Sequence, residues 1–222
     1  MKLTNLFFRT LAFLTAASAP VLGMADVVSL DPRATFLRTN DDPGALDTVP
    51  INLSGLSFAV SPGDFLHLQV LGDWRAGQNQ DFADTDTNTI GLFSSSNILL
   101  ASSSVNRVPG AIDAGTHFVT GPTFFGGIPT DIEQDFLIAA TGNTLTSIDI
   151  RVPVGGKFLF VAAHDSFYGD NNDPDGDYML QIAPGAPIPE PTVLALLLVG
   201  IPATGVLAAY RKHTAKAYAL LD

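Results

Sequence analysis

The 222-residue chain has no cysteine, and it has only 11 lysines and arginines against 22 aspartates and glutamates. Without cysteine it can form no disulfide, Cys-ligated zinc site, iron–sulfur cluster or thiol nucleophile. Its formal net charge of −11 would repel a phosphate backbone, so we expect no nucleic-acid partner. The acidic residues are concentrated in the middle of the chain, where the segment from Asp26 to Ile188 has 20 acidic and 6 basic residues. That segment is long enough for one domain with a hydrophobic core.

Residues 1–25 have the parts of a secretory signal peptide. Lys2 and Arg9 precede an apolar stretch from Leu11 to Leu22, and small residues lead up to Ala25. This order predicts a signal peptide that is cleaved after Ala25. The alternative is a buried N-terminal helix. We therefore expect the protein to be exported.

Residues 192–210 form an uncharged apolar run near the C-terminus. At ~1.5 Å per residue, a helix of this length spans ~28 Å, close to the ~30 Å hydrocarbon core of a bilayer. Arg211 and Lys212 follow directly, in a basic tail over residues 211–222. The sequence therefore predicts one transmembrane helix, with the tail in the cytoplasm and the acidic segment outside.

A short proline motif, Pro189-Glu190-Pro191, lies in a linker over residues 184–191, just before the apolar run. This order of motif, apolar run and basic cluster (Arg211 and Lys212) resembles the PEP-CTERM sorting signal of Gram-negative bacteria that make exopolysaccharide. The resemblance covers only the C-terminal end of the chain. It implies recognition by an exosortase, a membrane cysteine protease that cuts near the tripeptide, after transient anchoring in the inner membrane. The family tail usually stops a few residues after its basic cluster, whereas ten residues follow Lys212 here. A plain single-span anchor is the alternative.

Between the two termini the hydrophobic pattern is that of strands. From Asp64 to Val70, Phe65, His67 and Gln69 alternate with apolar residues, which indicates a half-buried strand. The run Lys157–Ala163 is apolar on both faces, as expected for a central strand. Residues 26–183 are therefore predicted to form an all-β domain, an antiparallel β-sandwich. The other predicted strands are Leu56–Val60, Thr89–Phe93, Ile98–Ala101, Phe136–Ala139, Ser147–Val152 and Asp177–Ile182.

The segment from His164 to Asp177 contains the densest group of candidate ligands, with five aspartates among its last thirteen residues. Carboxylates at this density repel one another unless they are solvated, protonated or bridged by a cation, and hard oxygen ligands favour Ca²⁺. Asn171-x-Asp173-x-Asp175-Gly176 follows the opening of a D-x-[DN]-x-[DN]-G calcium loop. It is no EF-hand, because the twelfth position is Ile182 and strands flank it. An ordinary solvated acidic turn is the alternative.

Three segments resemble the PA-type galactophilic lectins, which are small calcium-dependent β-sandwiches: residues 61–74, Ile90–Phe93 and Leu159–Ile182. The resemblance implies a jelly-roll or galactose-binding-like fold. The sugar-contacting histidine of that family has no counterpart in residues 78–89. The implied calcium ligands are Asp165, the carbonyl of Gly169, and a pair that is either Asp170 and Asn171 or Asn172 and Asp173.

Trp74 and Asp86 are candidates for saccharide contact. Trp74 could stack on a sugar ring, and Asp86, with Asp81 and Asp84, could line a saccharide groove or extend a metal site. The alternatives are rim packing for the tryptophan and a solvated loop for the aspartates.

The sequence offers little support for catalysis, because it has no G-x-S-x-G nucleophile elbow. We expect a non-catalytic protein of the cell surface or extracellular matrix, a calcium-stabilised saccharide-binding or matrix β-sandwich that meets exopolysaccharide. A purely structural matrix component without sugar specificity and a secreted polysaccharide hydrolase are the alternatives.

Overall fold

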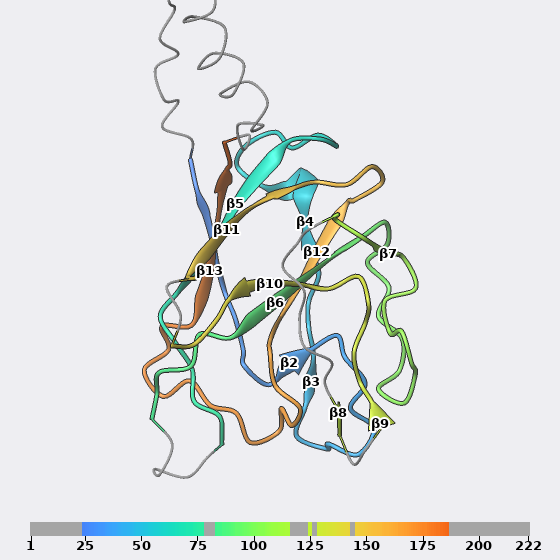
Figure 1. Ribbon diagram of the computed structural model, residues 1–222, viewed down its shortest axis with the longest axis vertical. Helices are drawn as coiled ribbons and strands as arrows, with labels where there is room; N and C mark the ends of the chain where they lie inside the picture. Colours follow the sequence, from blue (N-terminus) through green and yellow to red (C-terminus); the bar gives the residue numbers. More distant parts are fainter. Residues whose placement is uncertain (1–23, 78–82, 116–123, 126–127, 143–144, 187–222) are drawn as a thin grey trace, which may run out of the picture.

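Two antiparallel sheets make up most of the computed structural model (Figure 1). The first has the order β1 (Asp26–Ser29), β13 (Met179–Pro184), β5 (Phe65–Leu71), β11 (Ser147–Arg151). The second has the order β10 (Phe136–Ala139), β6 (Thr89–Ser94), β12 (Phe158–Ala163), β4 (Ile51–Asn52), and β7 (Ala111–Ile112) also pairs with β6. Two smaller pairs are the parallel β2 (Ala34–Thr35) and β3 (Leu46–Asp47), and the antiparallel β8 (Phe124–Phe125) and β9 (Ile128–Pro129). The predicted all-β, antiparallel class is thus confirmed. The structure describes residues 24–77, 83–115, 124–125, 128–142 and 145–186.

The predicted sorting elements fall outside this part of the chain. Most of the signal peptide, the Pro189-Glu190-Pro191 motif, the 192–210 span and the basic tail with Arg211 and Lys212 lie outside the described residues. Within those residues, no helix is both long and apolar enough to cross a bilayer.

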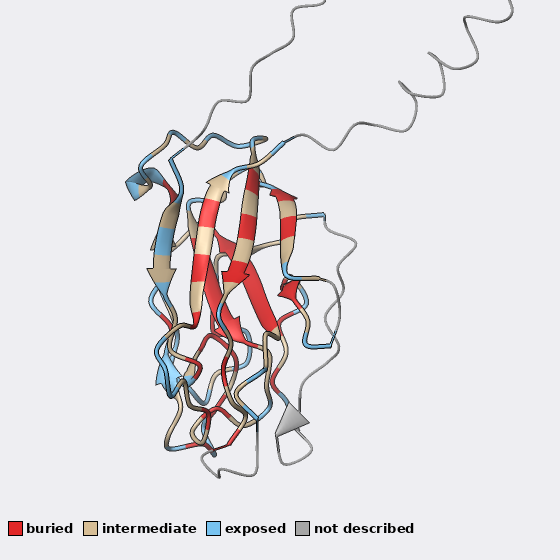
Figure 2. Ribbon diagram, turned by 90° about the vertical axis from the view of Figure 1, so that its left-hand side faces the viewer, coloured by how far each residue is buried: buried red, intermediate tan, exposed pale blue. Residues whose placement is uncertain are grey.

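The two sheets enclose one hydrophobic core, as the band of buried residues in Figure 2 shows. On β5, Leu66, Leu68 and Val70 point into this core, while the residues between them are half-buried. The predicted alternation is therefore confirmed. Since one face of this strand stays partly exposed, the outer face of the first sheet is a half-polar surface.

Strands β6 and β12 are covered on both faces. All six residues of β6 and the last five of β12 are buried, which confirms the prediction of a central strand at Lys157–Ala163. Part of the cover comes from the segment around β2 and β3. Phe36 packs edge-on against Phe160, with ring centroids 6.4 Å apart, and the Thr48 hydroxyl donates a 2.8 Å hydrogen bond to the Val161 carbonyl.

Two predicted strands are wrong. The segment Leu56–Val60 follows a 3-10 turn, η1 (Leu53–Gly55), and Ser57 is held by the Asp26 carboxylate at 2.7 Å from its backbone nitrogen. The segment Ile98–Ala101 follows a serine turn, in which the Ser96 hydroxyl accepts a 3.1 Å hydrogen bond from the Ile98 backbone. In both segments a side-chain oxygen accepts a hydrogen bond from a backbone N–H that would otherwise pair with a neighbouring strand.

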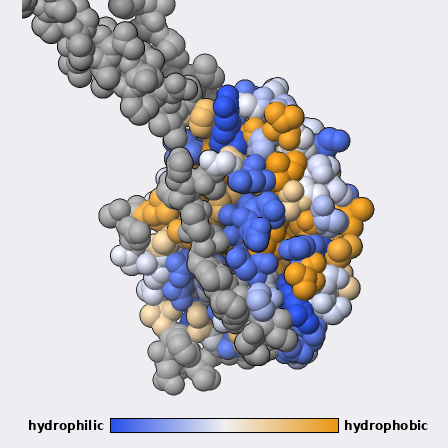
Figure 3. All heavy atoms as spheres, turned by 45° about the vertical axis from the view of Figure 1, so that its right-hand side comes forward, coloured by the Kyte–Doolittle hydropathy of each residue, from blue (hydrophilic) through white to orange (hydrophobic). Residues whose placement is uncertain are grey.

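The chain enters and leaves the domain at the same end. Strand β1 begins and strand β13 ends at the top of Figure 1, at the end of the domain that carries the loops 53–64 and 152–157. The acidic loop 164–178 and the loop after β5 lie at the opposite end. On the face that Figure 3 shows, hydrophobic and hydrophilic side chains are mixed. The acidic loop and the chain exits are separated by the length of the domain.

Candidate metal site

The acidic loop is fastened to the segment that follows β5. Arg75 and Asn172 exchange backbone hydrogen bonds of 2.8 and 3.0 Å. Trp74 and Asp86 form a similar bridge, with both bonds at 2.8 Å. Gly72 makes the sharp turn between β5 and these bridges, with a φ of +65° that favours glycine. Three segments distant in the sequence are thus held side by side at one end of the domain.

The Asp173 carboxylate organises the last turn of the loop. Its two oxygens accept hydrogen bonds from the backbone nitrogens of Gly176 at 2.9 Å, Asp177 at 3.3 Å and Tyr178 at 3.2 Å. The Asp177 carboxylate in turn accepts a 3.0 Å hydrogen bond from the Asp73 backbone nitrogen. These contacts hold the turn in a conformation in which carboxylate oxygens of Asp173, Asp175 and Asp177 lie within 4.8 Å of one another.

The three carboxylates form an electrostatically unbalanced cluster with two further aspartates. Burial, followed by repulsion from Asp84 and Asp177, raises the pKa of Asp73. Burial and the charge of Asp175 raise the pKa of Asp84, and the Arg75 guanidinium opposes this only in part. One carboxylate oxygen of Asp84 is also buried without a hydrogen-bond partner among the described residues. The cluster therefore holds more negative than positive charge, and a bound cation would reduce the repulsion among its carboxylates.

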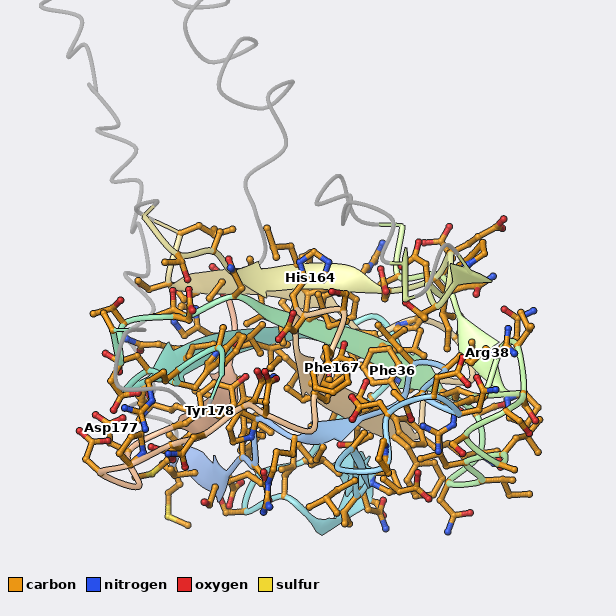
Figure 4. The ribbon with its side chains drawn as sticks, turned by 90° about the horizontal axis from the view of Figure 1, so that it is seen from below. Phe36, Arg38, His164, Phe167, Asp177 and Tyr178 are labelled. Atoms are coloured by element: carbon orange, nitrogen blue, oxygen red, sulfur yellow. The ribbon has the colours of Figure 1, made fainter. Side chains whose placement is uncertain are left out.

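Figure 4 views this end of the domain directly. Asp177 lies at the rim, whereas Tyr178 lies further in. The Tyr178 hydroxyl is 2.9 Å from that of Thr89 on β6, and the ring is fully buried. The acidic turn is thus joined directly to the core of the second sheet.

The first half of the loop is attached to a different part of the chain. The Asp42 carboxylate, which is buried, accepts hydrogen bonds from the backbone nitrogens of Tyr168 at 2.6 Å and Gly169 at 3.0 Å. The buried Asn171 side chain donates to the Pro32 carbonyl at 3.1 Å. This half of the loop is therefore packed against residues 32–42.

The structure does not bring the predicted calcium ligands together into one group. Asp165 caps its own turn, accepting a 2.6 Å hydrogen bond from Ser166, and burial raises its pKa while nearby Asp170 adds repulsion. Gly169 and Asn171 belong to the attachment at residues 32–42, and Asn172 contributes its backbone to the Arg75 bridge. Of the predicted ligands only Asp173 belongs to the carboxylate group with Asp175 and Asp177.

Sequence reasoning placed Asp175 in a calcium-loop pattern but did not select it, or Asp177, as a ligand. The spacing of Asp173, Asp175 and Asp177, at every second residue, was the signal for this group. Asp84 was considered, with Asp81 and Asp86, as an extension of a metal site, and the structure places it within reach of the charge of Asp175, whereas Asp81 lies outside the described residues. Asp73 gave no such signal, because only the backbone bridges bring its segment to the loop.

The candidate saccharide contacts do meet, through the backbone bridge between Trp74 and Asp86. The Trp74 side chain, however, belongs to the core: it is 2% exposed and packs on Tyr178, with ring centroids 6.5 Å apart. The structure thus favours the packing role, and no face of this ring is available to a sugar. Asp86 is half-buried beside it.

No family model, curated protein or solved structure matches the chain. The class of protein that the structure defines is an all-β domain with antiparallel sheets and an aspartate cluster at one end. The resemblances to sorting-signal proteins and to calcium-dependent lectins stay predictions from the sequence.

Proposed function

We propose that this chain is an exported, non-catalytic protein of the cell surface or extracellular matrix, sorted by an exosortase, whose β-sandwich binds Ca²⁺ through Asp173, Asp175 and Asp177. A jelly-roll or galactose-binding-like connectivity of the sheets is part of this proposal. The inner membrane is its transient anchor, and the exopolysaccharide layer is its final surroundings.

One observation carries the calcium assignment: three carboxylates are held within 4.8 Å of one another by backbone hydrogen bonds. Ca²⁺ accepts six to eight oxygen ligands at about 2.3–2.6 Å. The three aspartates supply part of this shell, and water and the neighbouring Asp73 carboxylate are suited to complete it. Neutralising the cluster would remove the repulsion that raises the pKa of Asp73 and Asp84.

The export that the sequence predicts agrees with an open calcium site at the surface of a domain. Extracellular calcium modules work with dissociation constants of roughly 10⁻⁴–10⁻³ M. An open site with three carboxylates at the surface of a domain suits this range, because its ligands are partly solvated and need no deep burial.

The calcium assignment is tested by thermal unfolding of the purified protein with Ca²⁺ and with EDTA. An ion that binds only the folded state stabilises it by about 2.7 kcal/mol at a hundredfold excess over Kd. For a protein of this size that corresponds to a rise in Tm of about 5–11 °C. Asp175→Asn should lose most of this response, because it removes one carboxylate ligand and leaves in place the backbone hydrogen bonds to Asp173 that shape the turn.

The control variant is Glu133→Gln, which removes one exposed negative charge outside the cluster. It should keep the full response to Ca²⁺. A Tm of the wild-type protein that is the same in Ca²⁺ and in EDTA would remove calcium from the proposal.

Saccharide binding is the second candidate, and the outer face of the first sheet favours it. Gln181, Gln69 and Ser147 are direct neighbours across β13, β5 and β11. In the next row the His67 ring lies 3.1 Å from the Asp149 carboxylate. Such a row of amide, hydroxyl, imidazole and carboxylate groups can pair with sugar hydroxyls. Glycan-array binding that is lost in Gln69→Ala and kept in Asp175→Asn would support this candidate, whereas no binding to any glycan would leave the matrix role.

A further inference from the structure

The end of the domain opposite the acidic cluster has a different surface chemistry. It is built from the loops 53–64 and 152–157, and the chain enters and leaves beside them (Figure 1). Val154, in the connection between β11 and β12, is 87% exposed, the highest value for a large hydrophobic side chain among the described residues. A single exposed apolar side chain is common on protein surfaces, so Val154 supports an interaction only together with the groups around it.

Two basic side chains flank this connection. Arg151 precedes it, Lys157 follows it, and both are exposed. Within the described part of the chain, the ion pairs involve Arg33, His67 and Arg107 and neither of these two residues. Arg151 donates a 3.2 Å hydrogen bond from Nε to the Gly63 carbonyl, and its guanidinium carbon lies 6.0 Å from the centroid of the Phe65 ring. These neutral contacts hold the side chain in place but leave its positive charge, like that of Lys157, without a paired carboxylate among the residues that the structure describes.

The acids at this end are already engaged. Asp26 accepts from Ser57 at 2.7 Å and Asp64 accepts from the Ser61 backbone at 2.8 Å. The third, Asp149, pairs with His67. These three carboxylates keep their charge, but with Arg151 and Lys157 beside them this end is far less acidic than the domain as a whole.

Two apolar hollows open beside the basic residues. The first, of about 430 Å³, is lined by Phe58, Val60 and Arg151, and also by Pro184 at the end of β13. The second, of about 490 Å³, is lined by Val60 and Lys157 among others. The first hollow is also lined by Asp64 beside Arg151, whereas Lys157 is the one charged residue among the described residues that line the second. An apolar lining next to a cationic group, as in the second hollow, is the chemistry that meets a lipid headgroup and the first part of its acyl chain.

The length of the chain beyond the domain limits where this end can be. Ala186 is the last described residue, and the predicted span begins six residues later at Thr192. At ~3.5 Å per extended residue, this linker reaches at most ~21 Å. The end that carries Val154 must therefore stay close to the bilayer for as long as the chain is anchored.

We propose that this end of the domain, through Val154, Arg151 and Lys157, docks on a bilayer surface that contains anionic lipid. The docking rests on the membrane anchor of the proposed function. It orients the domain so that the Asp173, Asp175 and Asp177 cluster points away from the membrane, into the space where an extracellular cation or matrix polymer is met.

The absence of cysteine makes a site-specific test direct. The full-length chain with Val154→Cys is labelled with a fluorophore and reconstituted into vesicles of phosphatidylcholine, with or without phosphatidylglycerol, that contain a headgroup-linked quencher. Ala83→Cys, at an exposed position in the loop of the acidic end, is the matched control. Flotation of the vesicles measures anchoring separately from docking.

In anionic vesicles the label at position 154 should be quenched several-fold more than the label at position 83. Lys157→Glu should weaken the contact by about fivefold or more, the effect of one basic side chain at an anionic surface. Arg33→Glu, which makes the same charge change near β2, should leave it unchanged. Unfolded variants are recognised by loss of the thermal transition.

The other outcomes separate the two claims. If the chain floats with the vesicles but both labels are equally unquenched, the docking is overturned and the anchor stands. If the chain does not float, the anchor itself is overturned. Equal quenching at position 154 in vesicles without phosphatidylglycerol overturns the role of anionic lipid.

Discussion

Gly72→Ala is the substitution that should reveal how the turn after β5 builds the acidic cluster. Gly72 has a φ of +65°, and a β-carbon at this position would overlap the backbone carbonyl and the carboxylate of Asp177. An alanine can be accommodated only if Asp177 moves. That movement breaks the 3.0 Å hydrogen bond from the Asp73 backbone to the Asp177 carboxylate and separates Asp177 from Asp173 and Asp175.

The cost has two parts. A left-handed conformation costs an alanine about 1–2 kcal/mol. The lost hydrogen bond to a charged acceptor costs about 1.5–3 kcal/mol more. Gly142→Ala isolates the first part, because Gly142 has a similar φ of +69° and a β-carbon there would meet no atom of the described residues within 4 Å.

Thermal unfolding of the two variants gives the difference. Gly72→Ala should unfold about 4–8 °C below Gly142→Ala, which corresponds to about 2 kcal/mol for a chain of this length. It should also lose the stabilisation by Ca²⁺, which Gly142→Ala should keep. Equal Tm values for the two variants, or a full response to Ca²⁺ in Gly72→Ala, would refute the coupling between the turn and the cluster.

Two further predictions concern protons and a buried charge. Folding raises the pKa of Asp73, Asp84 and Asp175, so these carboxylates bind protons more readily in the folded than in the unfolded chain. Their mutual repulsion therefore destabilises the Ca²⁺-free fold less as the pH falls toward the ordinary aspartate value of 3.8. The rise in Tm on adding Ca²⁺ should therefore shrink over that range, and a rise that grows with acid would contradict the assignment. The side chain of Arg107 is 1% exposed and donates hydrogen bonds to the carbonyls of Leu37 at 2.9 Å and Leu100 at 3.0 Å. Arg107→Met removes the donor of both bonds, so denaturant unfolding should show a loss of about 2–5 kcal/mol. Asp47→Asn keeps an oxygen that can accept from the guanidinium at a site that is 69% exposed, so it should lose less than Arg107→Met, and similar losses for both would show that the ion pair dominates.

The sheets could be predicted where the hydrophobic pattern is long. The alternation in β5 and the two-sided apolar run of β12 identified both strands within a residue or two. The edge strand β1 was missed because its four residues leave no room for a periodic pattern. Strands β2 and β3 were missed because two-residue strands depend on tertiary contacts.

The candidate site could be predicted only as far as it is local. The density of aspartates in residues 165–177 pointed to the loop in which Asp173, Asp175 and Asp177 lie close together. The separation of Asp165 from Asp173 could not be foreseen, because it depends on the Asp42 carboxylate, far away in the sequence, which holds Tyr168 and Gly169. Trp74 was ambiguous for the same reason: only the folded chain shows that Tyr178 covers its ring.

The central claim is that Asp173, Asp175 and Asp177 hold a calcium ion. The most direct measurement is a crystal structure of the protein grown with Ca²⁺ at a saturating concentration, with anomalous data to identify the ion. We predict one Ca²⁺ at about 2.3–2.6 Å from a carboxylate oxygen of each of the three aspartates. Three well-ordered carboxylates with only water between them would contradict the claim.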